Sequence, residues 1–519
     1  MLLDAKNQDE VSSDLSGDVV IIGAGTVGLF LAARLARDNR QVILVEGGGR
    51  VADTAQNTLT AQSQGKKHNG VLLGRASGLG GTSVLWGGQL AEFEEADLKR
   101  EDACWPISFA ELRGWYEHVY DQLGIVPPLA AAEYRRRFGD EVERSDNIER
   151  FFTFWMAQPN FARLFQREIM STARIRVILN ATVNDIILTG PKAEMVVAAS
   201  GVRQIRIKGN DFVFATGTIA TSRFFLSTQR RSAVPWKFNR QIGCYFQDHL
   251  GGKIANVEVF NEKRFREFFE NGFADDVKLQ PKLRLTAAAR SQVPTGICGL
   301  FAFDSEIAEN ISNIKTLVRA LKSGATFSGL GTLPRDVLAL GRAFGPLVMR
   351  YVRDRRVLAF FDRALEFHVQ AEQLPISRSR ITLQGDSVAA DGLFRATVDW
   401  QIDGREIKTI CGFARLADSY LQTHGIARLN VPPGLQSTNP AFLDQLSDTY
   451  HPCGGMRMSA VGSAGVVDPE CRVWDTTNVY IAGTSVFPSS SHANCTLTAL
   501  ALAARLSGTL RDGLNKSSE

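Results

Sequence analysis

The chain has 519 residues, of which 44% are hydrophobic and 22% charged, and its formal net charge at pH 7 is +4. At roughly 150 residues per domain, this length predicts two to four folded units with enough apolar material for their cores. So small a net charge gives no reason to expect nucleic acid as a partner. There is no apolar run of about 18 residues or more, and the N-terminal stretch is acidic without an apolar segment, which argues against a membrane span and a secretory signal.

The cysteines and histidines form no disulfide or metal-binding pattern. The seven cysteines are scattered, odd in number and without a CxxC pair, which favours reduced thiols in the cytoplasm. The seven histidines lack HExxH or a similar ligand spacing. We therefore expect a cytoplasmic protein without a metal site.

The first motif is a glycine-rich turn, GAGTVG, between the apolar run DVVII and a helical pattern. The β-branched run is typical of a buried parallel strand. Gly23 permits a tight turn, Gly25 lets a pyrophosphate approach the backbone, and Gly28 lets the helix pack closely on the strand. The first helical turn, with Thr26 and Val27, offers free N–H groups and a partial positive charge to phosphates.

Glu46 ends a second apolar strand, QVILVE, and lies 18 residues (46 − 28) after Gly28. A carboxylate at this distance can accept hydrogen bonds from ribose hydroxyls and disfavours a 2′-phosphate, so NADP is the weakest candidate. The unit alone leaves FAD, NAD and Rossmann relatives without a dinucleotide open.

A second glycine-rich stretch, GRASGLGGTSVLWGG, occupies residues 74–88 and holds six glycines in fifteen positions. So many glycines predict a loop whose backbone passes close to a flat or charged group. Near the C-terminus stand YHPCGGMRM, with His451, and SSSHANCTLT, with Asn494, 43 residues further on (494 − 451).

These segments together resemble the glucose-methanol-choline (GMC) oxidoreductases, flavoenzymes that take a hydride from an alcohol carbon. The resemblance implies that Gly81, Thr82, Ser83 and Trp86 wrap a flavin. Some relatives carry a histidine before the tryptophan that is bonded covalently to the flavin, whereas this chain has Leu85. The resemblance therefore implies FAD held non-covalently.

The same resemblance extends the cofactor site along the chain. It assigns Val183, Ala215 and Gly217 to the part that completes the FAD half-domain. Ala493 and Thr496 begin a helix whose N-terminus would point at the flavin N1/C2 carbonyl, where negative charge accumulates on reduction.

The resemblance also implies the catalytic pair. A neutral imidazole is suited to take a hydroxyl proton near neutral pH, and His451 matches the family's base. Asn494 matches the partner that holds the substrate oxygen. His492 is a secondary candidate, as an alternative base or a substrate contact. His249, in a junction motif, is interpreted as a structural histidine.

We expect an α/β fold with a Rossmann-like, GMC-type FAD-binding domain, residues 1–250 and 450–519. An α+β substrate domain, residues 251–449, would be built on an antiparallel sheet. Alternating apolar and polar residues, as in KIANVEVF and in stretches 367–383 and 394–402, predict this sheet.

Residues 303–366 match no segment of the family. A helical apolar stripe runs through them, and residues 335–363 hold seven Arg and three Asp, a net charge of +4 (7 − 3). A helical lid over the substrate pocket is the simpler interpretation. The alternative is a surface for anionic lipid or for a quinone-like electron acceptor.

The expected activity is FAD-dependent oxidation of an alcohol group to a carbonyl by hydride transfer to flavin N5. The WGG, AGTSVFP and HANCTLT segments resemble the pyranose-oxidase-like branch, which implies a sugar or polyol substrate. The electron acceptor would be quinone-like or O2. Two other classes stay open: a flavin monooxygenase or halogenase on a related fold, and an FAD-binding protein without catalysis.

Overall fold

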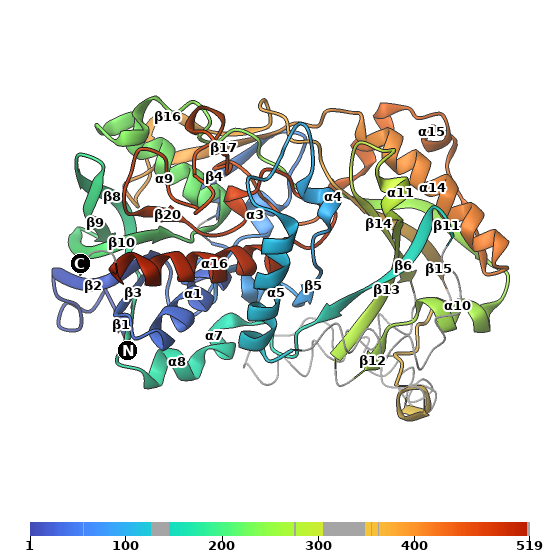
Figure 1. Cartoon of the computed structure of the whole chain (residues 1–519), viewed down its shortest axis with the longest axis horizontal. Coiled ribbons are helices and arrows are strands. Elements are labelled where there is room, and N and C mark those ends of the chain that lie inside the picture. Colours follow the sequence, from blue (N-terminus) through green and yellow to red (C-terminus); the bar gives the residue numbers. More distant parts are fainter. Residues whose placement is uncertain are drawn as a thin grey trace, which may run out of the picture.

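The computed structural model describes residues 1–55, 57–125, 145–274, 277–304, 348–353, 355–361 and 363–515. Figure 1 shows two sheet-containing bodies along the long axis of the molecule, one around β2 and β10 and the other around β13 and β14. Chain segments cross between them several times, so neither body is one continuous stretch of sequence.

The first sheet has the strand order β1-β7-β3-β2-β10-β9-β8, and β20 pairs with β10. Its centre is parallel and buried on both faces, which explains the apolar run at residues 19–22. The predicted Rossmann-like strand–turn–helix unit is therefore present. The strands are β1 (Leu2–Asp4), β2 (Asp14–Ile22), β3 (Val42–Val45), β7 (Ile175–Leu179), β8 (Thr182–Thr189), β9 (Lys192–Ser200), β10 (Arg203–Phe214) and β20 (Val479–Ile481).

Four long helices accompany this sheet: α1 (Thr26–Arg37), α5 (Phe109–Leu123), α9 (Gly217–Arg231) and α16 (Thr496–Asn515). Helix α16 packs against both α1 and α5, and Figure 1 shows it running alongside the sheet. Helix α5 begins as its sequence predicts, because the Ser108 hydroxyl accepts the N–H of Glu111 at 3.1 Å.

The second sheet has the order β18-β11-β15-β14-β13-β6-β5, with β12 on β13 and β19 on β11. Helices α10 (Glu262–Phe269) and α14 (Glu406–Thr423) cover one face of it through ring contacts such as Phe269 with Phe301 and Phe413 with Phe367. The strands are β5 (Gln89–Leu90), β6 (Ile148–Trp155), β11 (Leu250–Val259), β12 (Gly272–Ala274), β13 (Val277–Leu285), β14 (Ile297–Asp304), β15 (Ala364–Ala371), β18 (Ala427–Asn430) and β19 (Ser447–Asp448).

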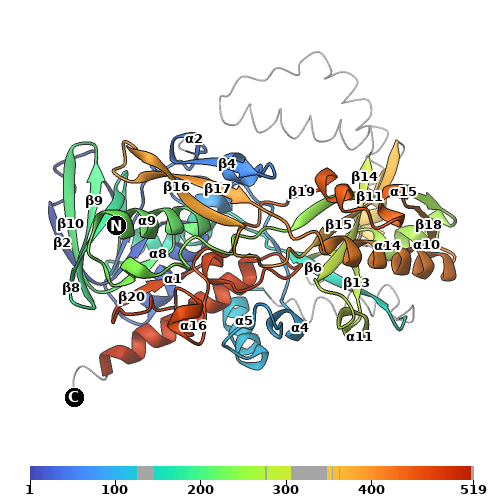
Figure 2. The ribbon, with the colours of Figure 1, turned by 90° about the horizontal axis from the view of Figure 1, so that it is seen from above.

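A third sheet departs from the expectation. Strands β16 (Arg380–Val388) and β17 (Phe394–Trp400) were expected in the substrate sheet, but they form a separate sheet with β4 (Ala61–Gly65). Arg223 of α9 holds the hairpin, because its guanidinium pairs with both oxygens of Asp391 at 2.6 and 2.8 Å. Both views place this sheet beside α9 (Figures 1 and 2).

The remaining elements are short and lie in the connections. They are α2 (Asn57–Thr60), α3 (Gly70–Leu73), η1 (Gly81–Val84), α4 (Glu95–Leu98), α7 (Phe161–Leu164), α8 (Gln166–Ser171), η2 (Pro235–Phe238), α11 (Ala287–Arg290), α15 (Pro433–Gln436), η4 (Pro440–Gln445), η5 (Gly462–Ala464) and η6 (Thr484–Val486).

The predicted helical insertion, residues 303–366, lies mostly outside the described residues. A described helical turn at 348–353 exposes Met349 and Val352, at 64% and 70%. Arg350 of the same turn pairs with Glu270 at 2.6 Å, so part of the segment's positive charge is neutralised within the protein. Across the described ranges, no helix is both long and apolar enough to cross a membrane.

Candidate active site

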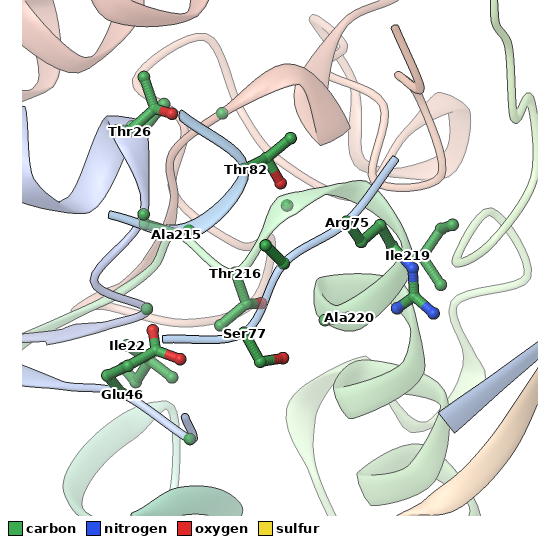
Figure 3. A pocket seen from close by; sticks show the side chains of 18 of the residues that line it. Ile22, Thr26, Glu46, Arg75, Ser77, Thr82, Ala215, Thr216, Ile219 and Ala220 are labelled. Atoms are coloured by element: carbon green, nitrogen blue, oxygen red, sulfur yellow. The ribbon is translucent and has the colours of Figure 1, made fainter. Parts of the chain in front are cut away.

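A cavity of about 1320 Å³ lies at the carboxyl ends of β2 and β10, with the glycine turn, the loop of residues 73–87 and the C-terminal segments around it. Figure 3 shows Thr26, Thr82 and Ala215 around one end of this cavity and the Glu46 carboxylate near Ile22. Crevices at the carboxyl ends of parallel strands are where α/β folds bind nucleotides.

Most of the predicted cofactor residues line this cavity. They are Gly23, Gly25, Thr26, Val27, Glu46, Gly81, Thr82, Ser83, Trp86, Val183, Ala215, Gly217 and Thr496. Gly28 and Ala493 do not: a Cβ on Gly28 would lie 1.9 Å from the Gly23 oxygen, so its role is the close approach of helix to strand. Sequence reasoning missed Arg75, Ser77 and Thr216, which also line the cavity (Figure 3).

The backbone at the start of α1 fits a dinucleotide. A Cβ on Gly81 would lie 2.7 Å from the Cα of Gly25, and one on Gly23 would lie 2.6 Å from the Ala215 oxygen. Glycine at these places keeps the backbones close to one another and to the cavity. The N-cap residue Gly25 supplies no side-chain cap, so N–H groups of the first turn remain for a pyrophosphate.

Glu46 has a second role beside the predicted ribose contact. One carboxylate oxygen accepts the N–H of Ala24 at 2.8 Å, and the other accepts those of Gly48 and Gly78, each at 2.9 Å. The side chain thereby ties the two glycine-rich segments together at the cavity wall. Burial raises the pKa of Glu46, although these three hydrogen bonds oppose the shift.

The structure brings the predicted catalytic pair together. Nδ2 of Asn494 lies 3.3 Å from Nε2 of His451, and both residues line the cavity. On the other side of the imidazole, Nδ1 lies 2.8 Å from the Thr449 hydroxyl oxygen. The His451 backbone N–H donates to both oxygens of Asp248, at 2.9 and 3.1 Å.

Asp248 is a fully buried support for this histidine, which the sequence did not reveal. Its carboxylate also accepts the N–H groups of His249 and Thr449, at 2.7 and 3.2 Å. Burial disfavours its charge, but the hydrogen bond with His68 and the nearby histidines lower the pKa of Asp248 below its ordinary value. It therefore stays a carboxylate and fixes the turn that carries His451.

The hydrogen bonds indicate the tautomer of His451. The Thr449 hydroxyl lies 3.5 Å from Oδ1 of Asp248, so it can donate there and accept from Nδ1–H of His451. Nε2 is then left with a lone pair facing the cavity. Burial, and next the neighbouring His249, lower the pKa of His451 to about 3, so the ring is neutral at physiological pH.

The structure does not bring His492 to the cavity. Its ring packs edge-on against Phe151 at 5.9 Å, its Nδ1 has no hydrogen-bond partner, and its backbone oxygen accepts from Gln370 at 2.7 Å. His249 is fully buried, with Nε2 3.2 Å from the Ser490 oxygen, as suits a structural histidine. Of the predicted catalytic histidines, His451 is the one that lines the cavity.

Among the residues that the structure describes, two clusters of acidic and histidine side chains stand outside the cavity. Their ligand-type atoms lie within 4.8 Å of one another; the members are His68, Asp248 and Asp448 in one, and Glu94, Asp97 and His492 in the other. His68 already bridges the two aspartates, at 3.1 and 3.6 Å, and Arg284 pairs with Glu94 at 2.5 Å. His68 and Arg284 thus already occupy part of each cluster.

Comparison with known families agrees with this geometry. Residues 18–237 match the model described as FAD dependent oxidoreductase, and residues 375–503 match that described as GMC oxidoreductase. The fold and cavity therefore define an FAD-binding oxidoreductase. Within that class, the match over residues 375–503 supports a flavoprotein of the GMC oxidoreductase family, as the two terminal motifs predict.

The curated relatives align over limited stretches. Paromamine 6'-oxidase from Streptomyces fradiae is 28% identical over 155 residues, 24% of this chain and 29% of that protein. Pyridoxine 4-oxidase from Microbacterium luteolum is 30% identical over 146 residues, 25% of this chain and 27% of that protein. The aligned part thus spans only about a quarter of these relatives' length.

Solved structures resemble the whole chain. Pyridoxine 4-oxidase from Mesorbium loti superposes with a TM-score of 0.61 at 14% identity, covering 95% of this chain and 98% of that one. Formate oxidase gives 0.58 at 14% identity, covering 98% and 100%. At such identity the likeness shows the shared fold.

Proposed function

We propose that the chain catalyses FAD-dependent oxidation of an alcohol group on a small molecule, most simply a sugar or polyol, to a carbonyl. The observation that carries the proposal is the His451–Asn494 pair, 3.3 Å apart in the wall of the dinucleotide cavity. FAD bound there would accept the hydride of the alcohol carbon at N5. Relatives named as oxidases of paromamine and pyridoxine support this class of reaction.

His451 is the proposed general base. Its Nε2 lone pair faces the cavity, and its low pKa keeps it in the proton-accepting form. A pKa of about 3 makes imidazole a weak base, but a weak base is sufficient here. As the carbon loses its hydride, the hydroxyl becomes that of a protonated carbonyl, which is strongly acidic. Proton transfer to Nε2 is thus favourable late in the reaction.

Asn494 is the proposed partner that orients the substrate oxygen. A hydroxyl lying between the two side chains can donate to Nε2 of His451 and accept from the Nδ2 amide of Asn494. The amide would then hold this oxygen against Nε2 of His451 while the proton leaves. The pair fixes the oxygen and thereby the direction of the carbon–hydrogen bond.

We further propose that FAD is held without a covalent bond. Leu85, which lines the cavity and is 47% exposed, stands where some members of the family carry the attaching histidine. A leucine side chain has no nucleophile with which to form that bond. For the compartment we propose the cytoplasm, in keeping with seven cysteines that are all unpaired.

The electron acceptor is proposed to be O2 or a quinone-like compound. The two curated relatives, paromamine 6'-oxidase and pyridoxine 4-oxidase, are oxidases, which supports O2. The positive charge of residues 335–363 is the reason to expect a bound quinone or an anionic membrane there. Arg350 of this segment is already paired with Glu270. Because this pairing leaves less positive charge for an anionic partner, O2 is the simpler proposal for the electron acceptor.

The test is anaerobic flavin bleaching with a panel of sugars and alcohols. We expect at least one compound to reduce the bound flavin, and His451→Ala to keep the flavin while slowing reduction about 10²–10⁴-fold. The exposed His118, which packs on Trp115, provides the control His118→Ala with an unchanged rate. A flavin that no alcohol bleaches would favour a non-catalytic protein. Reduction only by NADH or NADPH would favour a monooxygenase or halogenase.

A further inference from the structure

The face of the second sheet that is turned away from α10 and α14 looks toward the catalytic segment. Trp155 of β6 lines the cavity, and the Gln89 amide, also in the wall, donates to Thr153 and Gln280 at 2.7 Å each. Gln280 of β13 is paired with Thr153, and two residues further along the same face Lys282 is paired with Phe151. Lys282 therefore continues the polar row that leaves the cavity wall.

The residues around Lys282 contact the segment that carries His492 and Asn494. Its pairing partner Phe151 packs edge-on against His492, two residues before Asn494. On the same face, Gln370 of β15 donates to the His492 backbone oxygen at 2.7 Å. The lysine thus lies on the part of the sheet that touches the segment bearing Asn494.

Lys282 is buried, only 3% exposed, and within the described ranges no carboxylate lies at ion-pair distance from it. The other cations of the strand are engaged: Arg284 pairs with Glu94 and Glu149 at 2.5 and 2.9 Å, and Lys278 lies over the Trp155 ring at 4.4 Å. Among the described residues of β13, Lys282 is therefore the cation that has no carboxylate or aromatic partner.

A buried ammonium without a counter-ion is costly, so it calls for a partner. Burial lowers the pKa of Lys282, and among the described residues the Cys298 thiol opposes this lowering. The lysine also acts on the base: burial, then His249, lower the pKa of His451, and Lys282 adds to that lowering. The lysine is therefore within electrostatic reach of His451.

We propose that Lys282 binds a carboxylate group of the alcohol substrate, so that the substrate is a hydroxy acid such as a sugar acid. The inference rests on the proposed alcohol oxidation and names its substrate class. A single cation with amide and hydroxyl neighbours suits one negative charge better than a doubly charged phosphate. The carboxylate supplies the missing counter-ion, and the neighbouring polar row supplies hydrogen bonds for the rest of the molecule.

The first experiment uses two sets of polyhydroxy compounds of similar size that differ in charge. The FAD-loaded protein is mixed anaerobically with glucose, glucosamine and glucuronate, and with glycerol, 2-amino-1,3-propanediol and glycerate. We expect flavin reduction to be fastest with the carboxylate member of each set and slowest with the amine. Neutral members that reduce the flavin as fast as the acids would overturn the proposal and leave alcohol oxidation standing.

Variants localise the effect. Lys282→Met should lower the second-order rate constant for flavin reduction by the acids about 10- to 100-fold. This is the range for the loss of a hydrogen bond to a charged group. The neutral compounds should change less than about twofold. Lys282→Arg should keep part of the preference. The control is Lys253→Met on β11, because Lys253 is half-exposed and already paired with Glu366 at 2.7 Å. Retained flavin absorbance excludes misfolding.

A binding measurement separates this proposal from the proposed reaction. Acetate, glucuronate and inorganic phosphate are titrated calorimetrically into the FAD-loaded wild type and Lys282→Met. Carboxylate binding that the variant loses supports the site even if no compound is oxidised. Equal binding by both proteins, or none by the wild type, overturns it, and tighter binding of phosphate than of carboxylate overturns the assignment of the anion.

Discussion

Asp248→Asn tests whether the buried carboxylate under the catalytic turn matters for the reaction. In the structure one oxygen, Oδ2, accepts from His68 and from the His451 backbone, at 3.1 and 2.9 Å. An amide converts one of the two acceptor oxygens into a donor, so at least one such contact is lost. A hydrogen bond to a charged group is worth about 1.5–3 kcal/mol, and we expect the free energy of unfolding to fall by about that amount.

The same change should slow flavin reduction. The Asp248 carboxylate opposes the lowering of the His451 pKa, so its removal makes an already weak base weaker. Each 1.4 kcal/mol of lost imidazolium stabilisation costs about tenfold in rate, and we expect a loss of at least about tenfold under anaerobic, single-turnover mixing. The flavin spectrum should be unchanged.

Asp448→Asn is the matched control. Asp448 is equally buried and accepts the N–H groups of Asn69 and Gly70, at 2.6 and 2.8 Å, and it contacts His68 on the side away from His451. Its variant should lose stability but keep the reduction rate. If both variants slow reduction equally, the effect of Asp248 is general destabilisation, and its assigned role as support of the base is refuted.

Four further outcomes are expected. Asn494→Ala should slow flavin reduction by about 10²–10³ at most, less than His451→Ala, and the reverse order at saturating substrate would exchange their roles. The pKa of His451 is about 3 in the fold and near 6.5 in the unfolded chain. Its contribution to the free energy of unfolding is therefore full above about pH 6.5 and is lost as the pH falls to 3. Denaturant titrations should show the unfolding free energies of wild type and His451→Gln converging over that range. Acid precipitation should release FAD into the supernatant, and a coloured pellet would contradict the reasoning from Leu85. Mixing the reduced protein with air-saturated buffer and with quinones should give comparable or faster reoxidation by air; reoxidation by quinones alone would return attention to residues 335–363.

The parts of the site that the sequence predicts are those whose chemistry is local. The glycine turn at Gly23–Gly28 needs only a strand before it and a helix after it, and both are visible as periodic patterns. His451 and Asn494 each stand within a distinctive run of residues. Their contact follows from the resemblance to a family and not from the 43 residues between them.

The parts that the sequence does not predict depend on pairing between distant strands. In the sequence, Lys282 is an ordinary polar position of an alternating strand. Its place near the catalytic segment follows only from the pairing of β13 with β6, whose Phe151 contacts His492. Asp248 and Thr449 are 201 residues apart and meet only in the fold. Strand β17 pairs with β4, more than 300 residues earlier, and Arg223 of α9 forms an ion pair with Asp391 of the β16–β17 connection. No local sequence pattern predicts either contact.

The way in which the sheets share the chain limits how this enzyme can be divided. Strand β6, before residue 250, completes the second sheet, while β20, after residue 450, completes the first. A cut at residue 250 would leave open edges on both sides, and neither fragment would retain a closed core. Exchange of substrate specificity with a relative would therefore have to transplant β5 and β6 together with residues 250–449. The two sheets therefore have to be exchanged together. A chimaera joined only at residues 250 and 450 would expose unpaired strand edges, and we expect it to aggregate.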